Sequence, residues 1–180
     1  MNPNALTTTY WLDGKDCIIS VSGPWDEFAQ ENEGIHLSAD EIQGRPIWDY
    51  VTGDVTRMWL HTLLKLSIVS KKALERPYRC DSPELKRYMR MKITVEKDGL
   101  LKIDHILQSV EKRLIPLRSV HTSKSPSKMI KMKCSICGRI DDGVSWEEPQ
   151  FEHTNGFGEL TVAYTVCCDC RVSLPKGCEL

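Results

Sequence analysis

Four cysteines near the carboxyl end of this 180-residue chain have the spacing of metal ligands. They form two Cys-x-x-Cys pairs separated by 29 residues, Cys134 with Cys137 and Cys167 with Cys170. Two intervening residues let a tight turn direct both sulfurs at one point, and two such turns supply four soft ligands for a tetrahedral ion. We therefore predict a structural Zn²⁺ site, closed to substrate because protein thiolates fill every coordination position.

Neighbouring donors leave the ligand set open in detail. Cys168 could replace Cys167 or Cys170, although the two-residue gap favours those two. Cys178 and His153 are spare donors, and we treat both as non-ligands. Redox disulfides, an iron–sulfur cluster and coincidence are the alternatives to zinc. Because a segment of about 50 residues buries too little apolar surface to fold alone, bound metal is expected to contribute much of its folding energy.

The charge of the chain is distributed in blocks. The formal net charge is -1, yet residues 55–133 carry 19 basic and 7 acidic side chains, and both flanking blocks are acidic. A basic block of this kind can face an acidic partner. Within and around the cysteine segment, four basic side chains are close enough in sequence to offset thiolate charge: Lys131, Lys133, Arg139 and Arg171.

Composition and patterning place the chain among globular cytoplasmic proteins. Hydrophobic residues make up 41% and charged residues 27%, which excludes a disordered chain. We find no apolar stretch long enough to cross a bilayer and no secretory signal. We therefore expect a cytoplasmic protein without membrane contact, in which the eight cysteines stay reduced.

The first two thirds of the chain have the pattern of an α+β domain. Residues 16–22 predict a first strand, and residues 25–29 predict a short strand or turn. Residues 88–96 alternate apolar and polar at the two-residue period of a half-exposed strand. Asp98-Gly99 then predicts a hairpin turn into a return strand over about 101–111. We expect an antiparallel sheet with helices on one face.

The longest helix is predicted over about 55–72, after a cap at Thr52-Gly53-Asp54. Apolar residues recur along it at three- and four-residue steps and form one stripe: Val55, Met58, Trp59, Thr62, Leu66 and Val69. Leu60, Leu64 and Ile68 lie on the other side. We therefore expect this helix to be covered on more than one face.

These patterns predict two domains and a linker. A sensor-like domain covers 10–118, a polar, serine-rich linker covers 119–128, and the cysteine module covers 129–180. In the module, residues 160–166 predict a strand. Gly143, Asn155-Gly156 and Gly158 provide turns for an inserted hairpin. The expected fold is therefore an α+β sheet domain followed by a small, zinc-stabilised, β-rich module.

The order of elements, together with residues 18–29 (IISVSGPWDEFA) and 42–51 (IQGRPIWDYV), resembles a PAS sensory domain over about residues 10–113. The resemblance implies a pocket between sheet and helices that receives a small molecule or a protein signal, and it implies frequent pairing of two copies. Candidate pocket residues are His105, Trp48 and Trp59, although a hydrogen-bonded core histidine and packed tryptophans explain the same positions. The ligand is unknown, and His61 is expected on the surface.

The cysteine segment is similar to a zinc-ribbon-like module found after sensory domains in bacterial signalling proteins. The matching residues are 134–140 (CSICGRI), 144–147 (VSWE) and 166–170 (VCCDC). The pattern usually has a histidine before the last pair, where this chain has Tyr164. The similarity implies architecture more than activity.

These features are compatible with three classes of function. The first is a signal-sensing or adaptor protein of bacterial signal transduction, whose output passes through a protein partner. The alternative is a nucleic-acid-binding transcriptional regulator that uses the basic middle block. An enzyme is expected least, because the chain contains no phosphate-binding loop, Gly-x-Ser-x-Gly or His-Glu-x-x-His motif.

Overall fold

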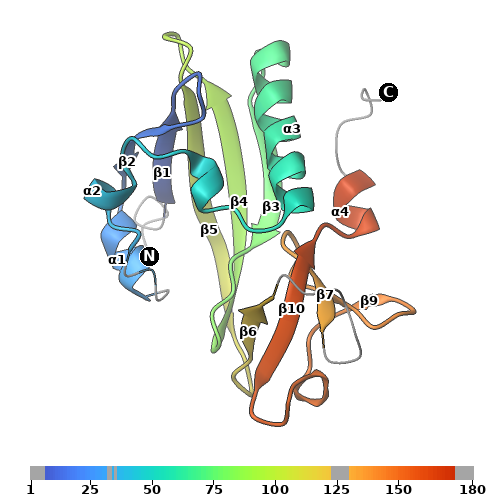
Figure 1. Cartoon of the computed structure of the whole chain (residues 1–180). Helices are drawn as coiled ribbons and strands as arrows, with labels where there is room; N and C mark the ends of the chain where they lie inside the picture. The colour runs from blue at the N-terminus through green and yellow to red at the C-terminus, as the bar shows by residue number, and fades with distance from the viewer. Residues whose placement is uncertain (1–6, 32–33, 35, 123–129, 173–180) are drawn as a thin grey trace. The chain divides into compact units, whose positions relative to one another are not determined.

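The computed structural model describes residues 7–31, 34, 36–122 and 130–172 (Figure 1). Its helices are α1 (Trp25–Glu31), α2 (Ala39–Ile42), α3 (Asp54–Ser70) and α4 (Cys168–Val172), with short 3-10 turns η2 (Ile47–Asp49) and η3 (Phe151–His153). Its strands are β1 (Thr7–Leu12), β2 (Ile18–Ser22), β3 (Leu74–Arg79), β4 (Leu85–Val95), β5 (Leu101–Lys112), β6 (Arg118–His121), β7 (Lys131–Cys134), β8 (Ile140–Asp141), β9 (Trp146–Glu147) and β10 (Glu159–Thr165). The fold is α+β, as predicted.

The chain divides into two compact units. The first consists of Met1–Thr52, His61–Tyr78 and Tyr88–Ser109, and the second of Gly53–Leu60, Arg79–Arg87 and Val110–Leu180. Helix α3 and strands β3, β4 and β5 therefore each contribute residues to both units. None of the helices in the described part of the chain is long and apolar enough to span a membrane.

The first sheet has the strand order β2-β1-β5-β4-β3. Strand β1 pairs antiparallel with both neighbours, and its register places Leu12 opposite Leu101 and Tyr10 opposite Ile103. The predicted alternation in β4 is confirmed, because Met89, Met91 and Ile93 are buried while the residues between them are more exposed. The predicted turn at Asp98-Gly99 is also confirmed, with Gly99 at φ +85° between β4 and β5.

Two elements near the amino end differ from the prediction. Residues 25–29, expected as a short strand or turn, belong to helix α1; Pro24 precedes its first turn, and Phe28 N donates to the Pro24 carbonyl. Proline before a helix costs no hydrogen bond, and Asp26 and Glu27 suit the first turn. The prediction also began the sheet at residue 16 and missed β1, in which three consecutive threonines precede Tyr10 and hide the apolar alternation.

The predicted helix over 55–72 is confirmed as α3, but its buried face is not the predicted apolar stripe, of which Trp59 alone is buried. The other buried residues of α3 are Leu60 and Leu64, which were expected on the other side, together with Leu63 and Ser67. Met58 and Val69, both members of the predicted stripe, are 65% and 81% exposed. Apolar residues occur nearly all round this helix, so periodicity alone left two faces open, and burial of the leucines decided between them.

The second sheet has the strand order β6-β10-β7-β8-β9. Strand β10 is parallel to both β6 and β7, and β8 and β9 form an antiparallel hairpin. The predicted strand over 160–166 and the expected inserted hairpin are therefore confirmed as β10 and β8–β9. The core of this sheet consists of Ile140, Leu160 and Val162, with Tyr164 packed against it.

The expected linker over 119–128 is described only in part. Ser119 and the next two residues lie in β6, where they pair with β10. Residues 123–128 of the expected linker lie outside the described residues.

Candidate metal centre

Parallel pairing of β7 and β10 brings the two cysteine pairs together. Cys134 is the last residue of β7, and it lies opposite Thr165, the last residue of β10. Parallel strands end at the same edge of a sheet, so the chain after each strand starts from neighbouring points. Cys137 follows three residues after the end of β7, and Cys167 follows two residues after the end of β10.

A tight turn closes between the first two cysteines. Cys134 N donates to the Arg139 carbonyl over 2.8 Å, and Gly138 N donates to the Cys134 carbonyl over 2.9 Å. Gly138 has φ +76°, in the left-handed region where a glycine carries no Cβ penalty. The turn is tied to β10 as well, because Ser135 N donates to the Thr165 carbonyl over 2.9 Å.

The structure brings together the four cysteines that the sequence singled out. The sulfurs of Cys134, Cys137, Cys167 and Cys170 all lie within 4.8 Å of one another. Those of Cys137 and Cys167 are 3.7 Å apart, and the cysteines are free of disulfides. Metal–sulfur bonds of about 2.3 Å give a tetrahedron with edges of about 3.8 Å, so this separation fits two ligands of one tetrahedral ion.

Burial and hydrogen bonds make the four thiols unequal. Cys134 and Cys167 are buried, and Cys167 N donates to the Cys134 sulfur over 3.4 Å. A hydrogen bond from the Cys134 thiol, supported by Arg139, lowers the pKa of Cys137 to about 4. Burial raises the pKa of Cys170 to about 12. Cys137 therefore ionises more readily than Cys170, and the thiolate is the form in which sulfur binds metal.

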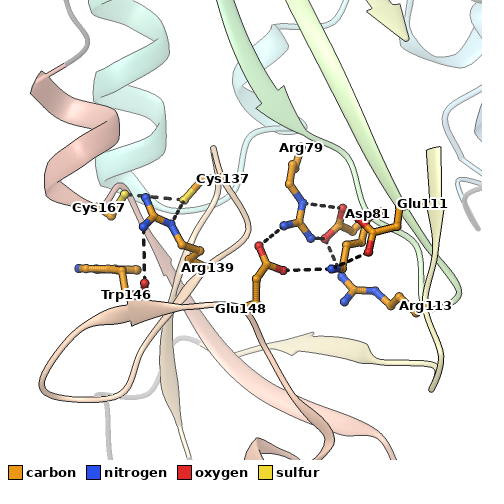
Figure 2. Close-up of polar contacts among 10 residues, drawn as sticks. Arg79, Asp81, Glu111, Arg113, Cys137, Arg139, Trp146, Glu148 and Cys167 are labelled. Carbon is orange, nitrogen blue, oxygen red and sulfur yellow. Dashed lines mark hydrogen bonds and ion pairs between the residues drawn. The ribbon is translucent and has the colours of Figure 1, made fainter. Parts of the chain in front are cut away.

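Arg139 is the cation that meets the cluster (Figure 2). Its Nε donates to the Cys137 sulfur over 3.4 Å, and its Nη2 donates to Asp169 Oδ2 over 2.8 Å. Of the four basic residues expected to offset thiolate charge, Arg139 is the one with a hydrogen bond to sulfur, whereas Lys133 donates to Ser119 Oγ over 2.9 Å. The guanidinium thus bridges one sulfur and one carboxylate beside the cluster.

The other candidate donors lie outside the cluster. Cys168 is exposed and its sulfur is 3.6 Å from Asp169 Oδ1. His153 Nε2 is 2.9 Å from a carboxylate oxygen of Glu147, and its Nδ1 accepts from Gln150 N. Cys178 lies outside the described residues. Among the described residues, the sulfurs within reach of one ion are therefore those of the two Cys-x-x-Cys pairs.

Arg79, at the end of β3, supports the turn between the first two cysteines. Its backbone N donates to the Ile136 carbonyl over 2.7 Å. Its guanidinium lies so close to Gly138 that a Cβ added there would meet Arg79 Cζ at 3.2 Å. This residue therefore holds both the backbone and the outer surface of the turn.

Arg79 belongs to a network of charges within the second unit (Figure 2). Its Nε donates to Asp81 Oδ1 over 3.1 Å, its terminal nitrogens pair with Asp81 and Glu148, and Arg113 Nη2 lies 2.7 Å from Asp81 Oδ2. Lys86 continues the network, 3.6 Å from Glu148 and 3.2 Å from a carboxylate oxygen of Glu111.

The sequence did not indicate this network. Arg79 and Glu148 are 69 residues apart, and no local spacing links them. The only local signal is the short spacing of Arg79 and Asp81, and Asp81 lies in the connection just after the end of β3. Burial would lower the pKa of Arg79, but hydrogen bonds and charge from Asp81 and Glu148 hold it above its usual value.

His105, the first candidate pocket residue, lies in a half-buried aromatic cluster of the first unit. Its Nδ1 is hydrogen-bonded to the Tyr78 hydroxyl at 2.6 Å, and its ring stacks on Tyr10 with centroids 5.3 Å apart. Tyr10 in turn meets the edge of Trp25 at 6.2 Å. Burial lowers the pKa of His105 to about 4, so the imidazole is neutral near pH 7.

The two tryptophans named as pocket candidates have different neighbours. Trp48 Nε1 donates to Asp16 Oδ2 over 3.2 Å, and its ring lies 5.8 Å from that of His61, which is exposed as expected. Trp59 is buried, and within the described part of the chain its Nε1 has no hydrogen-bond partner. Trp59 belongs to the second unit, whereas Trp48 and His105 belong to the first.

Comparison with models of known protein families gives no match for this sequence, and comparison with curated proteins gives none either.

Proposed function

We propose that this protein is a signal-sensing adaptor with a structural Zn²⁺ in its second part. In this proposal a PAS-like domain receives a small ligand or a partner, and the cysteine module provides an interaction surface in bacterial signal transduction. The assignment of the ion as zinc follows from the donor set, since four thiolates in a tetrahedral arrangement suit zinc in a reducing compartment.

The observation that carries the proposal is the closed four-sulfur cluster. Four sulfurs lie within 4.8 Å of one another, and two of the cysteines are fully buried. Such a set leaves no coordination position for substrate, so the bound ion would supply cross-linking of two chain segments and no reaction chemistry. Arg139 would offset part of the negative charge that four thiolates and one zinc carry.

Two features support the sensory half of the proposal. The order of elements along the first unit, in which strands and short helices are followed by α3 and a β4–β5 hairpin, is the order that the PAS resemblance implies. The cluster of His105, Tyr78 and Tyr10 combines aromatic surface with polar atoms, which is the composition of a small-molecule site.

A nucleic-acid-binding regulator remains the second candidate. Its main support is the basic block, but three of those basic residues are paired with carboxylates in the network: Arg79, Lys86 and Arg113. Paired cations attract phosphate less than unpaired ones, so we rank this function below the adaptor. Retention on heparin at moderate salt would reverse the order.

Native mass spectrometry of freshly purified protein tests the proposal. We expect one zinc ion per chain, and the same spectrum reports retained small molecules and the number of subunits. Cys170→Ser should abolish zinc retention, whereas the matched change Cys168→Ser, two positions away and exposed, should leave it intact. Zinc retained equally by both variants would contradict the assignment of the site.

A further inference from the structure

Two sulfurs of the candidate metal centre, one from each Cys-x-x-Cys pair, lie in direct contact. The sulfur of Cys137 is 3.7 Å from that of Cys167 (Figure 2). A disulfide bond is about 2.05 Å long, so bond formation needs an approach of roughly 1.7 Å. Both residues belong to the second unit, and both are free thiols. A small movement of the two side chains would therefore join them once one sulfur is oxidised.

Burial decides which sulfurs a small oxidant reaches from solvent. Cys134 and Cys167 are 0% and 1% exposed, whereas Cys137 is half-buried. The sulfur of Cys134 is also covered by a hydrogen bond from Cys167 N over 3.4 Å. An oxidant that approaches from water therefore meets Cys137 before either of the buried cysteines.

Arg139 adds a positive charge at the accessible sulfur. Its Nε donates to the Cys137 sulfur over 3.4 Å, and Asp169 holds its other end at 2.8 Å. The side chain of Arg139 is 31% exposed, so the guanidinium connects the sulfur to solvent. Reactive cysteines lie in partly exposed, electropositive surroundings of this kind. The contact with Arg139 favours Cys137 as the sulfur that reacts first.

We propose that Cys137 and Cys167 form a redox site at which hydrogen peroxide replaces the metal link between the two cysteine pairs by a disulfide. The inference deepens the proposed function by naming a chemical signal, and it rests on the proposed zinc site. A metal-bound cysteine is already a thiolate, so no proton has to be removed before the sulfur reacts.

The reaction has two steps. The Cys137 thiolate attacks one oxygen of hydrogen peroxide, so that an S–O bond forms, the O–O bond breaks and hydroxide leaves. The product is a sulfenic acid. The Cys167 thiolate then attacks this sulfur, the S–S bond forms, and the S–O bond breaks with loss of a second hydroxide. The two sulfurs lose two electrons and the peroxide gains them, and two protons from solvent convert the two hydroxides to water.

The disulfide joins the same chain segments as the ion. Cys137 follows β7 and Cys167 follows β10, so a bond between them ties the ends of both strands. It also removes two of the four sulfur ligands, and release of the ion follows. A disulfide within either Cys-x-x-Cys pair would join neither strand to the other. Oxidised, metal-free protein should therefore protect the amides of β7 and β10 from hydrogen exchange better than reduced, metal-free protein does.

The experiment treats zinc-loaded, full-length protein with hydrogen peroxide. Released zinc is followed with a chromogenic chelator, and the disulfide is located by alkylation, trypsin digestion and mass spectrometry. Cleavage after Lys133, Arg139 and Arg171 places the first cysteine pair in peptide 134–139 and the second in peptide 140–171. A disulfide between the pairs links these two peptides, whereas disulfides within the pairs leave them separate.

We expect zinc release to accompany the linkage of the two peptides through Cys137 and Cys167. Dithiothreitol with added zinc should restore the starting state. Arg139→Gln should slow both readouts several-fold, because the cation at the reacting sulfur is lost. A merely structural role of Arg139 would have the opposite effect, since weaker zinc binding speeds zinc loss. The matched controls are Lys131→Gln and Cys168→Ser, and both should react like the wild type.

Several outcomes would overturn the proposal. Zinc retained at excess peroxide, or disulfides only within the pairs, would contradict it, and so would a linkage that uses Cys170 in place of Cys137 or Cys167. Loss of the reaction in Cys168→Ser would assign it to that exposed thiol. Untreated protein without zinc would contradict the metal proposal alone, and the peptide map of the reduced, metal-free chain would then decide whether Cys137 and Cys167 form the redox pair.

Discussion

Asp81 is the carboxylate that holds two buried arginines, and its replacement by asparagine is the most informative single change in the second unit. Asp81 is 9% exposed, and the side chains of Arg79 and Arg113 are 6% and 5% exposed. Asparagine keeps the shape of the side chain and removes its charge. Both guanidinium groups would then remain buried beside a neutral amide.

The size of the effect follows from burial. Removing one partner of a buried ion pair typically costs about 3–5 kcal/mol, because the remaining charge stays desolvated. Glu148 still contacts Arg79 in the variant, so we expect about 3 kcal/mol less free energy of unfolding, at the low end of that range. Glu111 lies at the exposed end of the same network, 54% exposed, and Glu111→Gln should cost no more than about 1 kcal/mol.

Urea unfolding at neutral pH, with zinc in excess, measures both variants. Tryptophan fluorescence, to which Trp59 and Trp146 of the second unit contribute, and circular dichroism both follow unfolding of the whole chain. If Asp81→Asn and Glu111→Gln lower the free energy of unfolding equally, burial does not govern the network and the reasoning is refuted. An Asp81→Asn protein as stable as the wild type would refute it as well.

Three further changes test the turn, its guanidinium and the aromatic cluster. Gly138→Ala places a Cβ in left-handed backbone and against Arg79, so it should destabilise the second unit by at least about 1–2 kcal/mol and weaken zinc affinity, measured by chelator competition. Arg139→Gln removes the cation that donates to Cys137 and should lower zinc affinity by about tenfold in the same assay. His105 has a pKa of about 4 when folded and an ordinary value near 6.5, so the unfolded state binds more protons between these values and stability falls as the pH falls. When the pH is lowered from 7 to 5, the free energy of unfolding measured in urea should fall by about 2 kcal/mol less in His105→Gln than in the wild type.

Each of these has a matched control. Gly156→Ala has the same left-handed backbone, at φ +87°, but nothing within 4 Å of the new Cβ, so it separates strain from the clash with Arg79. Lys131→Gln removes a nearby charge that has no place in the cluster and should leave zinc affinity unchanged. His61→Gln removes an exposed histidine and should retain the full loss of stability at pH 5. If a control variant changes stability or zinc affinity as much as its test variant does, the corresponding prediction is contradicted.

Local patterns predicted those elements whose burial is decided within the element. The alternation around Met89 and Ile93 marks a strand with one buried face, and Asp98-Gly99 marks its turn. Helix α3 was placed correctly, but its buried face was not, because Leu63 and Val69 are equally apolar and only packing distinguishes them. Strand β1 was missed because three threonines give no clear apolar period.

The candidate metal centre was visible in the sequence because each cysteine pair is local. The sequence did not show how the two pairs meet. They meet because β7, which has only four residues, pairs in parallel with β10, which lies much later in the chain. The support of the turn by Arg79 was also hidden, because Arg79 and Ile136 lie far apart in the chain and only the folded backbone joins them. Non-local pairing of short strands has no signature in either strand alone.

The dependence of the second sheet on its metal is tested most directly by amide hydrogen exchange before and after exhaustive chelation. With zinc bound, β7 and β10 should be protected, because Cys134 and Cys167 fix the ends of both strands. After chelation, protection of β7 and β10 should fall strongly and return when zinc is added back, while β1 and β4 stay protected. Unchanged protection of β7 and β10 in the metal-free protein would contradict the account.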